Sequence, residues 1–280
     1  MGGTPVPFVH ILVLAAVQGL TEFLPVSSSG HLLLVPYFMG WTDQGRIMDV
    51  AMHIGTLLAV LIYFWRDIFA MTRAFGRSFK LVATGRPMDK EFWLILKLII
   101  ASIPAVIFGL AIEKYFPDGM RDVSIVAWTT IIFGILLYVA DKLFMTIRRM
   151  EHISYWGAFF VGCFQALALV PGTSRSGATM TAARMLGIER SDAARFSFLM
   201  AIPTILGAGL LEGYKVYESG DLSLAHDAMI GGVLSFVFGL GAIAFMMTWL
   251  RRASFAPFVV YRLILGAVLM YLIYGSGSLL

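Results

Sequence analysis

Six stretches of this sequence are apolar over roughly the length that crossing a bilayer requires. They lie at about 48–65, 92–112, 124–144, 196–211, 228–250 and 255–274. A crossing helix needs about 20 mostly apolar residues, and backbone groups inside the bilayer must be paired, so only helices and closed barrels span it. Charged residues make up 14% of the chain, against about 25% in soluble domains. The sequence therefore predicts an all-α integral membrane protein, with one membrane domain over residues 1–280.

Two further apolar stretches are each interrupted by a proline and a cluster of polar residues. They are 18–31, QGLTEFLPVSSSGH, and 165–179, QALALVPGTSRSGAT. The apolar runs around each break, 8–24 with 29–39 and 156–170 with 176–186, are too short to cross the bilayer alone. Non-helical backbone at membrane depth is tolerated only inside the protein or against water. Each break therefore predicts a re-entrant helical hairpin beside the six transmembrane helices.

The two broken stretches belong to an internal repeat. Equivalent positions lie 146 to 148 residues apart: Gln18 and Gln165, Pro25 and Pro171, Gly40 and Gly187, and the stretches 52–58 and 200–206. Each half, 1–147 and 148–280, then holds one hairpin and three spans. An odd number of spans inverts the second half relative to the first. In this inverted-topology repeat, broken helices meet near the middle of the membrane and form a site.

The charged loops predict the orientation of the chain. Six Lys and Arg residues lie between 66 and 90, and two further basic loops lie at 142–149 and 251–252. The stretch 212–227 instead carries one Lys against four acids. Basic loops face the cytoplasm, so we expect both termini and the first break on the outer side. The net charge of +4 is spread over these loops and indicates topology, not nucleic-acid binding.

The polar residues at the breaks are of types that bind phosphate esters. If the two hairpin tips meet, helix N-termini near Ser28 and Ser174 offer free N–H groups to an anion. The planar guanidinium of Arg175 suits phosphate oxygens. His31 follows Ser28 by about one helical turn, so these two side chains can share a face. The breaks therefore predict an anion site with phosphate as the favoured ligand.

The same region contains residues that can perform chemistry. Gln18 and Glu22 lie four residues apart on one helix face and can activate a hydroxyl or water, or hold a divalent cation. The Ser28 hydroxyl can serve as a nucleophile, with His31 or Glu22 as its base, although attack by water or by His31 stays open. Arg262, inside the last span, is a candidate second phosphate ligand.

Each candidate also has a structural alternative. The serines at 27–29 can cap a helix after the proline turn, His31 can bond a backbone carbonyl, and Arg175 can be only the counter-ion of Glu22. His53 lies in the first turns of a predicted span and fits a structural role. Glu22 is the hardest to explain structurally, because an unpaired buried carboxylate is costly.

These motifs resemble those of the bacterial undecaprenyl-diphosphate phosphatase family, the integral-membrane type also known for bacitracin resistance. Positions 18–22, QGLTE, fit an (E/Q)xxxE motif, positions 25–31 read PVSSSGH, and positions 171–179, PGTSRSGAT, fit PGxSRSxxT. The similarity covers nearly the full length and includes Tyr261 and Arg262. Gln18 stands at the first acidic position of the motif, which weakens any scheme that needs two carboxylates. Ser29 stands where Thr is often found.

The resemblance implies hydrolysis of undecaprenyl diphosphate to the monophosphate and phosphate, which recycles the carrier lipid of cell-wall synthesis. It also implies a bacterial inner-membrane location, a site facing the periplasm, and a divalent cation, Mg²⁺ or Ca²⁺, held at Glu22. By matching positions, the implied catalytic residues are Ser28, His31, Glu22 and Arg175. The implied substrate-binding residues are Ser174, Ser176, Thr179 and Arg262. From their place at the first break, we also expect Gln18, Ser27 and Ser29 to bind substrate.

The same features fit a second class of protein. Inverted repeats with broken helices are also a transporter plan, so the cluster can instead carry phosphate or flip a lipid head group. A hydroxyl, an imidazole and a carboxylate beside Arg175 favour an enzyme, because anion carriage needs neither a nucleophile nor a base. The sequence leaves the oligomeric state open.

Overall fold

The structure, a computed structural model, describes all residues except 1–5, 116–121, 145, 220–224 and 276–280. The helices are α1 (Phe8–Phe23), α2 (Ser28–Met39), α3 (Gly45–Tyr63), α4 (Trp65–Ala83), α5 (Lys90–Tyr115), α6 (Val123–Leu143), η1 (Met150–His152), α7 (Tyr155–Leu167), α8 (Arg175–Met185), α9 (Arg190–Ser219), α10 (Ala225–Trp249), α11 (Ala256–Met270) and η2 (Tyr271–Gly275). Within the described ranges, an isolated bridge between Arg148 and Ile188 is the only β-type pairing.

Five helical segments of the described chain are long and apolar enough to cross a membrane. They are α5, α6, the Arg190–Leu211 part of α9, the His226–Trp249 part of α10, and Ala256–Gly275 of α11 and η2. The sixth predicted span, 48–65, corresponds to α3, which passes the same test only as a bent pair with α4. The prediction of an all-helical membrane protein is confirmed, with five spans or with six if the bent pair counts as one.

The segment 66–90, predicted as a basic loop, is largely helical. α4 follows α3 after Phe64 and is bent from it by 78°. Its basic residues recur at helical spacing among apolar ones, and such a two-sided pattern forms an amphipathic helix despite its charge. The predicted acidic loop 212–227 lies partly outside the described residues, and α9 continues through its first part to Ser219.

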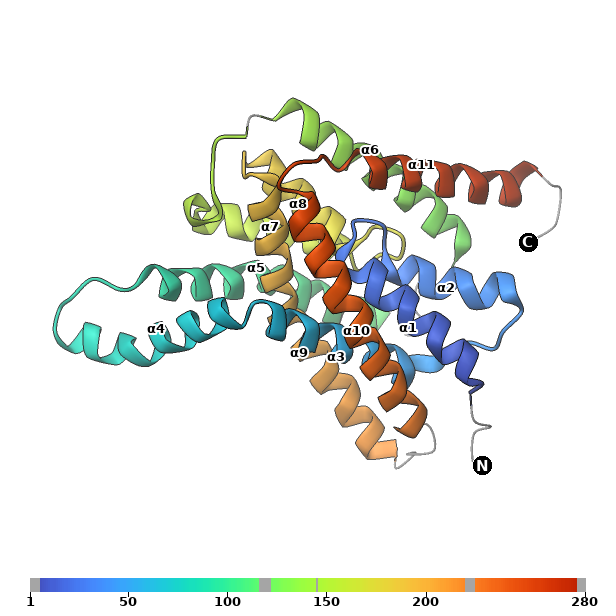
Figure 1. Cartoon of the computed structure of the whole chain (residues 1–280), viewed down its shortest axis with the longest axis horizontal. Coiled ribbons are helices and arrows are strands. Elements are labelled where there is room, and N and C mark those ends of the chain that lie inside the picture. Colours follow the sequence, from blue (N-terminus) through green and yellow to red (C-terminus); the bar gives the residue numbers. More distant parts are fainter. Residues whose placement is uncertain (1–5, 116–121, 145, 220–224, 276–280) are drawn as a thin grey trace.

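Both predicted helix breaks are present. α1 ends at Phe23 before α2 begins at Ser28, and α7 ends at Leu167 before α8 begins at Arg175. Figure 1 shows the two connecting loops close together near the centre of the molecule, between α2 and α8. The prolines explain the interruptions, since a proline disfavours the helical conformation of the residue before it.

The helices around the breaks pack closely because glycine removes side chains at their contacts. α3 packs along α10, and a Cβ atom at Gly55 would lie 2.0 Å from the carbonyl oxygen of Gly232. α7 packs along α5, and a Cβ atom at Gly162 would lie 2.4 Å from the carbonyl oxygen of Ala101. α1 also packs along α10, where a Cβ atom at Gly19 would lie 2.8 Å from the carbonyl oxygen of Ser235. The first helix of each broken pair, α1 or α7, therefore packs through a glycine against a long helix.

Candidate active site

Each break ends in a serine with a left-handed backbone. Ser27 has a φ of 78° and Ser174 a φ of 72°, and no other described residue except glycine has a positive φ. Their hydroxyls cap the following helices by accepting hydrogen bonds from Gly30 N at 3.3 Å and Gly177 N at 3.1 Å. Such a backbone costs about 1–3 kcal/mol and persists only where its surroundings enforce it. The hydrogen bond from Gly30 N confirms the structural alternative that Ser27 caps the helix after the proline turn.

The two breaks contact each other directly. The Ser176 hydroxyl donates to the carbonyl oxygen of Leu24 at 3.0 Å. A Cβ atom at Gly30 would lie only 3.4 Å from the Cα atom of Gly172. The expectation that the two broken stretches meet is therefore met, and the starts of α2 and α8 lie side by side.

The buried side chain of Arg262 binds the backbone of both breaks. Its side chain is fully buried, and its guanidinium donates to backbone carbonyl oxygens at 3.0 to 3.3 Å, those of Thr129 and Thr130 in α6, Pro25 in the first break, and Gly172 and Thr173 in the second. The candidate second phosphate ligand is thus a clamp on the two loops, away from the cavity described next. The sequence placed Arg262 in the last span, but it did not indicate which residues its side chain would contact.

A cavity of about 350 Å³ opens beside the breaks. Its lining comes from both breaks, α3 and α9: Glu22, Ser27, Ser28, Ser29, Asp49, Val50, His53, Ala168, Ser174, Arg175, Thr204, Ile205, Ala208 and Gly209. The polar groups come mostly from the breaks and α3, whereas α9 contributes mainly apolar side chains. The cavity therefore offers a polar end and an apolar wall, as an amphiphilic ligand requires.

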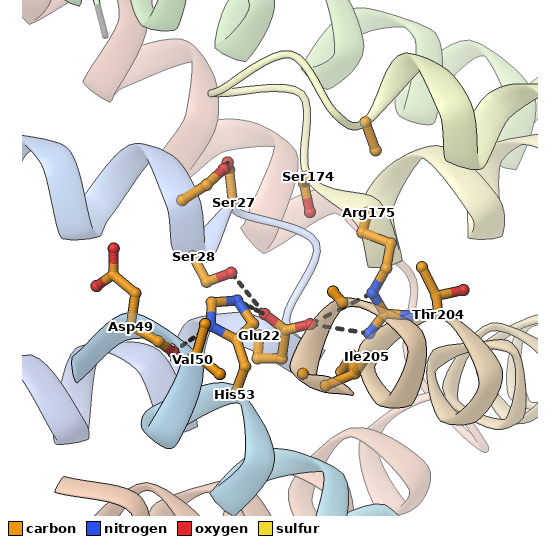
Figure 2. A pocket seen from close by; sticks show the side chains of 14 residues that line it. Glu22, Ser27, Ser28, Asp49, Val50, His53, Ser174, Arg175, Thr204 and Ile205 are labelled. Atoms are coloured by element: carbon orange, nitrogen blue, oxygen red, sulfur yellow. Dashed lines mark hydrogen bonds and ion pairs between the residues drawn. The ribbon is translucent and has the colours of Figure 1, made fainter. Parts of the chain in front are cut away.

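Glu22 is the centre of the polar end. Its Oε1 atom accepts from Arg175, at 3.0 Å from Nη2 and 3.3 Å from Nε. Its Oε2 atom accepts from Ser28 Oγ at 2.6 Å and Gln18 Nε2 at 3.1 Å, and lies 3.7 Å from His53 Nε2. Figure 2 shows Ser28, His53 and Arg175 converging on this carboxylate from three elements. The buried charge is thus compensated, and one oxygen is placed to take a proton from Ser28.

The two main partners of Glu22 occupy equivalent positions of the repeat. Ser28 is the first residue of α2 and Arg175 the first residue of α8, 147 positions apart. The same offset relates the capping serines 27 and 174. Each break therefore presents one side chain to the same carboxylate, a hydroxyl from the first and a guanidinium from the second.

Arg175 combines the two roles considered for it. It is the counter-ion of Glu22 and it also lines the cavity. Its Nη1 atom donates to the carbonyl oxygen of Ser197 at 3.0 Å, and its side chain is 14% exposed. A planar guanidinium fixed in this way can face an anion in the cavity while it keeps its carboxylate partner.

His31 does not join Ser28. Its Nδ1 atom lies 2.6 Å from the carbonyl oxygen of Ser27, and its Nε2 atom lies 2.5 Å from the hydroxyl of Tyr261. His31 is absent from the described lining of the cavity. The structural alternative, a bond to a backbone carbonyl, is the arrangement present. One helical turn allowed a shared face, but Ser28 turns back towards Glu22 and His31 towards α11.

Two other predicted substrate-binding residues lie behind the cavity wall. Ser176 is buried against the first break, and Thr179 Oγ1 lies 2.7 Å from Ser197 Oγ. Ser27, Ser29 and Ser174 do line the cavity. The hydroxyls of the second motif therefore serve mainly to fix α8 against its neighbours.

His53 and Asp49 were missed as site residues. Both line the cavity from α3, and His53 Nδ1 lies 2.7 Å from the carbonyl oxygen of Asp49, which orients the ring. His53 was assigned a structural role, whereas the structure places it beside Glu22. The only sequence signal was a pair of ionisable residues in an otherwise apolar span, of which His53 lies within the stretch 52–58 that the repeat reproduces.

The polar end offers oxygen atoms that fit Mg²⁺ or Ca²⁺. Glu22 and Asp49 line the cavity with their carboxylates. Gln18, whose Oε1 atom is buried without a hydrogen-bond partner, is absent from the described lining. Among the described residues, no group of three or more His, Cys, Asp or Glu side chains forms a metal site. Mg²⁺ commonly uses one or two carboxylates and completes its shell with substrate phosphates and water. The donor set fits such a shared site.

Fold and cavity together define a multi-pass helical membrane protein whose cavity combines a hydroxyl, a carboxylate and a guanidinium. Comparison with known proteins agrees with this class. The family model described as bacitracin resistance protein BacA matches residues 11–268. The chain belongs to this family.

Relatives match over nearly their whole length. The undecaprenyl-diphosphatase of Jannaschia sp. is 46% identical over 266 residues, which cover 95% of this chain and 98% of the relative. That of Alcanivorax borkumensis is 46% identical over 260 residues, covering 93% and 97%. That of Alteromonas mediterranea is 43% identical over 266 residues, covering 95% and 98%. The similarity therefore spans both breaks and all of the helices between them.

Proposed function

We propose that this protein is a membrane phosphatase that hydrolyses undecaprenyl diphosphate to undecaprenyl phosphate and phosphate, and so recycles the carrier lipid for cell-wall synthesis. The observation that carries the proposal is the contact of Ser28 Oγ with Glu22 at 2.6 Å, opposite Arg175, on a cavity with an apolar wall. The names of the relatives support the substrate.

In the proposed reaction, Ser28 Oγ attacks the terminal phosphorus while its proton passes to Glu22. The bond between that phosphorus and the bridging oxygen breaks, and the lipid monophosphate leaves with the electron pair. Glu22 then passes that proton to the departing lipid phosphate. Water next attacks the phosphorus of the phosphoserine and gives a proton to Glu22, the bond between that phosphorus and Ser28 Oγ breaks, and Glu22 returns the proton to Oγ as phosphate is released. A positioned base contributes about 10²–10⁴-fold to such a step.

Charge on the transferred phosphoryl group is stabilised by fixed donors. Arg175 offers its guanidinium at the polar end, and the first N–H groups of α2 and α8 have no partner inside their helices. The two N-termini lie side by side because the breaks touch and Arg262 holds both loops. Such preorganised donors stabilise a phosphoryl transition state without moving.

A divalent cation, Mg²⁺ or Ca²⁺, is proposed as cofactor. Glu22 and Asp49 would hold it together with phosphate oxygens of the substrate. When bound, it would neutralise part of the diphosphate charge. In the absence of substrate, the pairing of Glu22 with Arg175 leaves the carboxylate stable without a metal.

We further propose that the breaks are re-entrant hairpins of an inverted-topology repeat, in halves 1–147 and 148–280. The matched φ values of Ser27 and Ser174 support this, as do their equal caps. Gln18 and Gln165, equivalent in sequence, each hold a buried Oε1 atom without a partner. The basic segment that contains α4 supports a cytoplasmic position for it, and with it an inner-membrane protein whose cavity opens to the periplasm.

Substituting Arg175 separates its charge from its shape. We expect Arg175→Lys to lose most of kcat while it keeps part of substrate binding, because only the planar fork can bond Glu22 and a phosphate oxygen together. Arg175→Ala should lose both. The measurement is kcat and KM for each variant, with thermal unfolding in parallel. Wild-type-like turnover in Arg175→Lys would contradict a role for the guanidinium in binding phosphate, and Arg175 would then be only the counter-ion of Glu22.

Phosphate release by the purified protein tests the proposed function. In detergent, without a second compartment, the wild-type protein with Mg²⁺ or Ca²⁺ should release phosphate from undecaprenyl diphosphate continuously. A carrier of phosphate or of a lipid head group would release none, because transport leaves the diphosphate intact. Absence of release with either cation would therefore contradict the enzyme assignment.

A further inference from the structure

α4 has three distinct faces. At 100° per residue, the described packed residues Met71, Ala74 and Ser78 share one side. Exposed apolar residues occupy a second, wider sector: Trp65, Phe69, Phe75, Phe79 and Val82, each more than half exposed. The cations Arg66, Arg73, Arg77 and Lys80 form a narrow third stripe, about 60° wide on the same helical geometry.

The cation stripe borders the apolar sector directly. The Arg73 guanidinium lies 4.8 Å from the centre of the Phe69 ring, and that of Arg66 lies 5.4 Å from the Trp65 ring. Asp67 of α4 pairs with Arg195, and Asp89, after the end of α4, pairs with Arg77 of the stripe. Three cations of the stripe, Arg66, Arg73 and Lys80, have no carboxylate partner among the described residues.

The bend before α4 sets its direction. α3 packs along α10, which is long and apolar enough to cross the bilayer, so α3 runs in the crossing direction. α4 leaves α3 at 78° and therefore does not continue the crossing direction of α3. Figure 1 shows α4 extending out of the helical body, with the first part of α5 beside it.

We propose that α4 lies in one surface of the bilayer, with its apolar sector among the acyl chains and its cation stripe bound to anionic phospholipid head groups. A basic helix with segregated faces is suited to this position. Each Lys or Arg near an anionic membrane surface contributes about 1 kcal/mol of attraction, or about fivefold in local binding. Anionic lipid would then steady α4 and the α3–α4 bend at the edge of the protein, at a distance from the cavity.

Lipid-borne quenchers can test this position without any activity measurement, so the result is independent of the proposed function. In a Cys163→Ser background, a fluorophore is placed at Phe79→Cys. The protein is reconstituted in nanodiscs of equal parts phosphatidylglycerol and phosphatidylcholine, with bromine on one lipid or the other. We expect bromine to quench the fluorophore and aqueous iodide not to. Brominated phosphatidylglycerol should be at least about fivefold more effective per lipid, the factor given by one cation.

Removal of the unpaired cations provides the matched comparison. Arg66→Gln/Arg73→Gln/Lys80→Gln should bring the two brominated lipids to parity, whereas Arg251→Gln/Arg252→Gln, on a different basic segment, should leave the preference intact. Strong quenching by iodide would overturn the proposal. So would an equal effect of both lipids on the unsubstituted helix. Protection from both quenchers, with crosslinking between copies through position 79, would assign the apolar sector to a second copy instead.

Discussion

Glu22→Gln is expected to lower kcat by at least about 10²-fold, the scale for losing a positioned acid–base group. The amide keeps the size of the side chain and can still accept a bond from Arg175, but it cannot take the Ser28 proton. KM should not rise, because Arg175, released from its charged partner, faces the substrate more strongly. Steady-state kinetics at saturating divalent cation would show this split between kcat and KM.

The control for Glu22→Gln is Glu91→Gln, which neutralises a carboxylate at the start of α5, away from the cavity lining. It should leave both constants unchanged. Thermal unfolding of both variants would show whether lost activity reflects lost structure. Near-normal turnover in Glu22→Gln would reduce the carboxylate to a structural partner of Arg175.

Arg262→Leu should be the most destabilising single change at the site. It leaves the carbonyl oxygens of both breaks without their donor, and each buried unsatisfied group costs about 1–3 kcal/mol. We expect either no folded protein or a Tm lower by about 10 °C or more. Arg262→Lys should recover only part of the loss, because an ammonium cannot reproduce the spread of the guanidinium. Unfolding in detergent provides the measurement.

A phosphate ligand would behave differently at this position. Loss of turnover in Arg262→Leu at an unchanged Tm would show that Arg262 binds the substrate, and it would contradict its role as a structural clamp on the two loops. Arg252→Leu, an exposed position in the loop before α11, is the control and should leave Tm almost unchanged.

Apolar runs and prolines predicted most of the helices, because membrane helices are long and their interruptions conspicuous. The breaks after Phe23 and Leu167 fall within a few residues of the predicted positions. α4 was not predicted, because its charge resembled that of a loop and its periodicity was not considered. Local composition therefore located the apolar helices but not the amphipathic one.

The site was predictable as a set of residue types but not as a geometry. Glu22, Ser28 and Arg175 were chosen as ionisable or nucleophilic groups at membrane depth, and they do lie together. Spacing along a helix cannot say which neighbour a side chain will meet, so His31 was given a place beside Ser28. His53 was overlooked because its partner, Glu22, lies on another helix, and only the packing of α3 against its neighbours brings them together.

The most direct measurement of the central claim is phosphate release from undecaprenyl diphosphate by purified Ser28→Ala, compared with wild type and Ser29→Ala. Ser29 lines the same cavity without a bond to Glu22. If Ser28 is the nucleophile, its loss should lower kcat by at least about 10³-fold, since only binding and charge stabilisation remain. Ser29→Ala should retain most of its turnover. Ser28→Ala with more than about a tenth of wild-type kcat, a loss below the range for one catalytic group, would contradict the account.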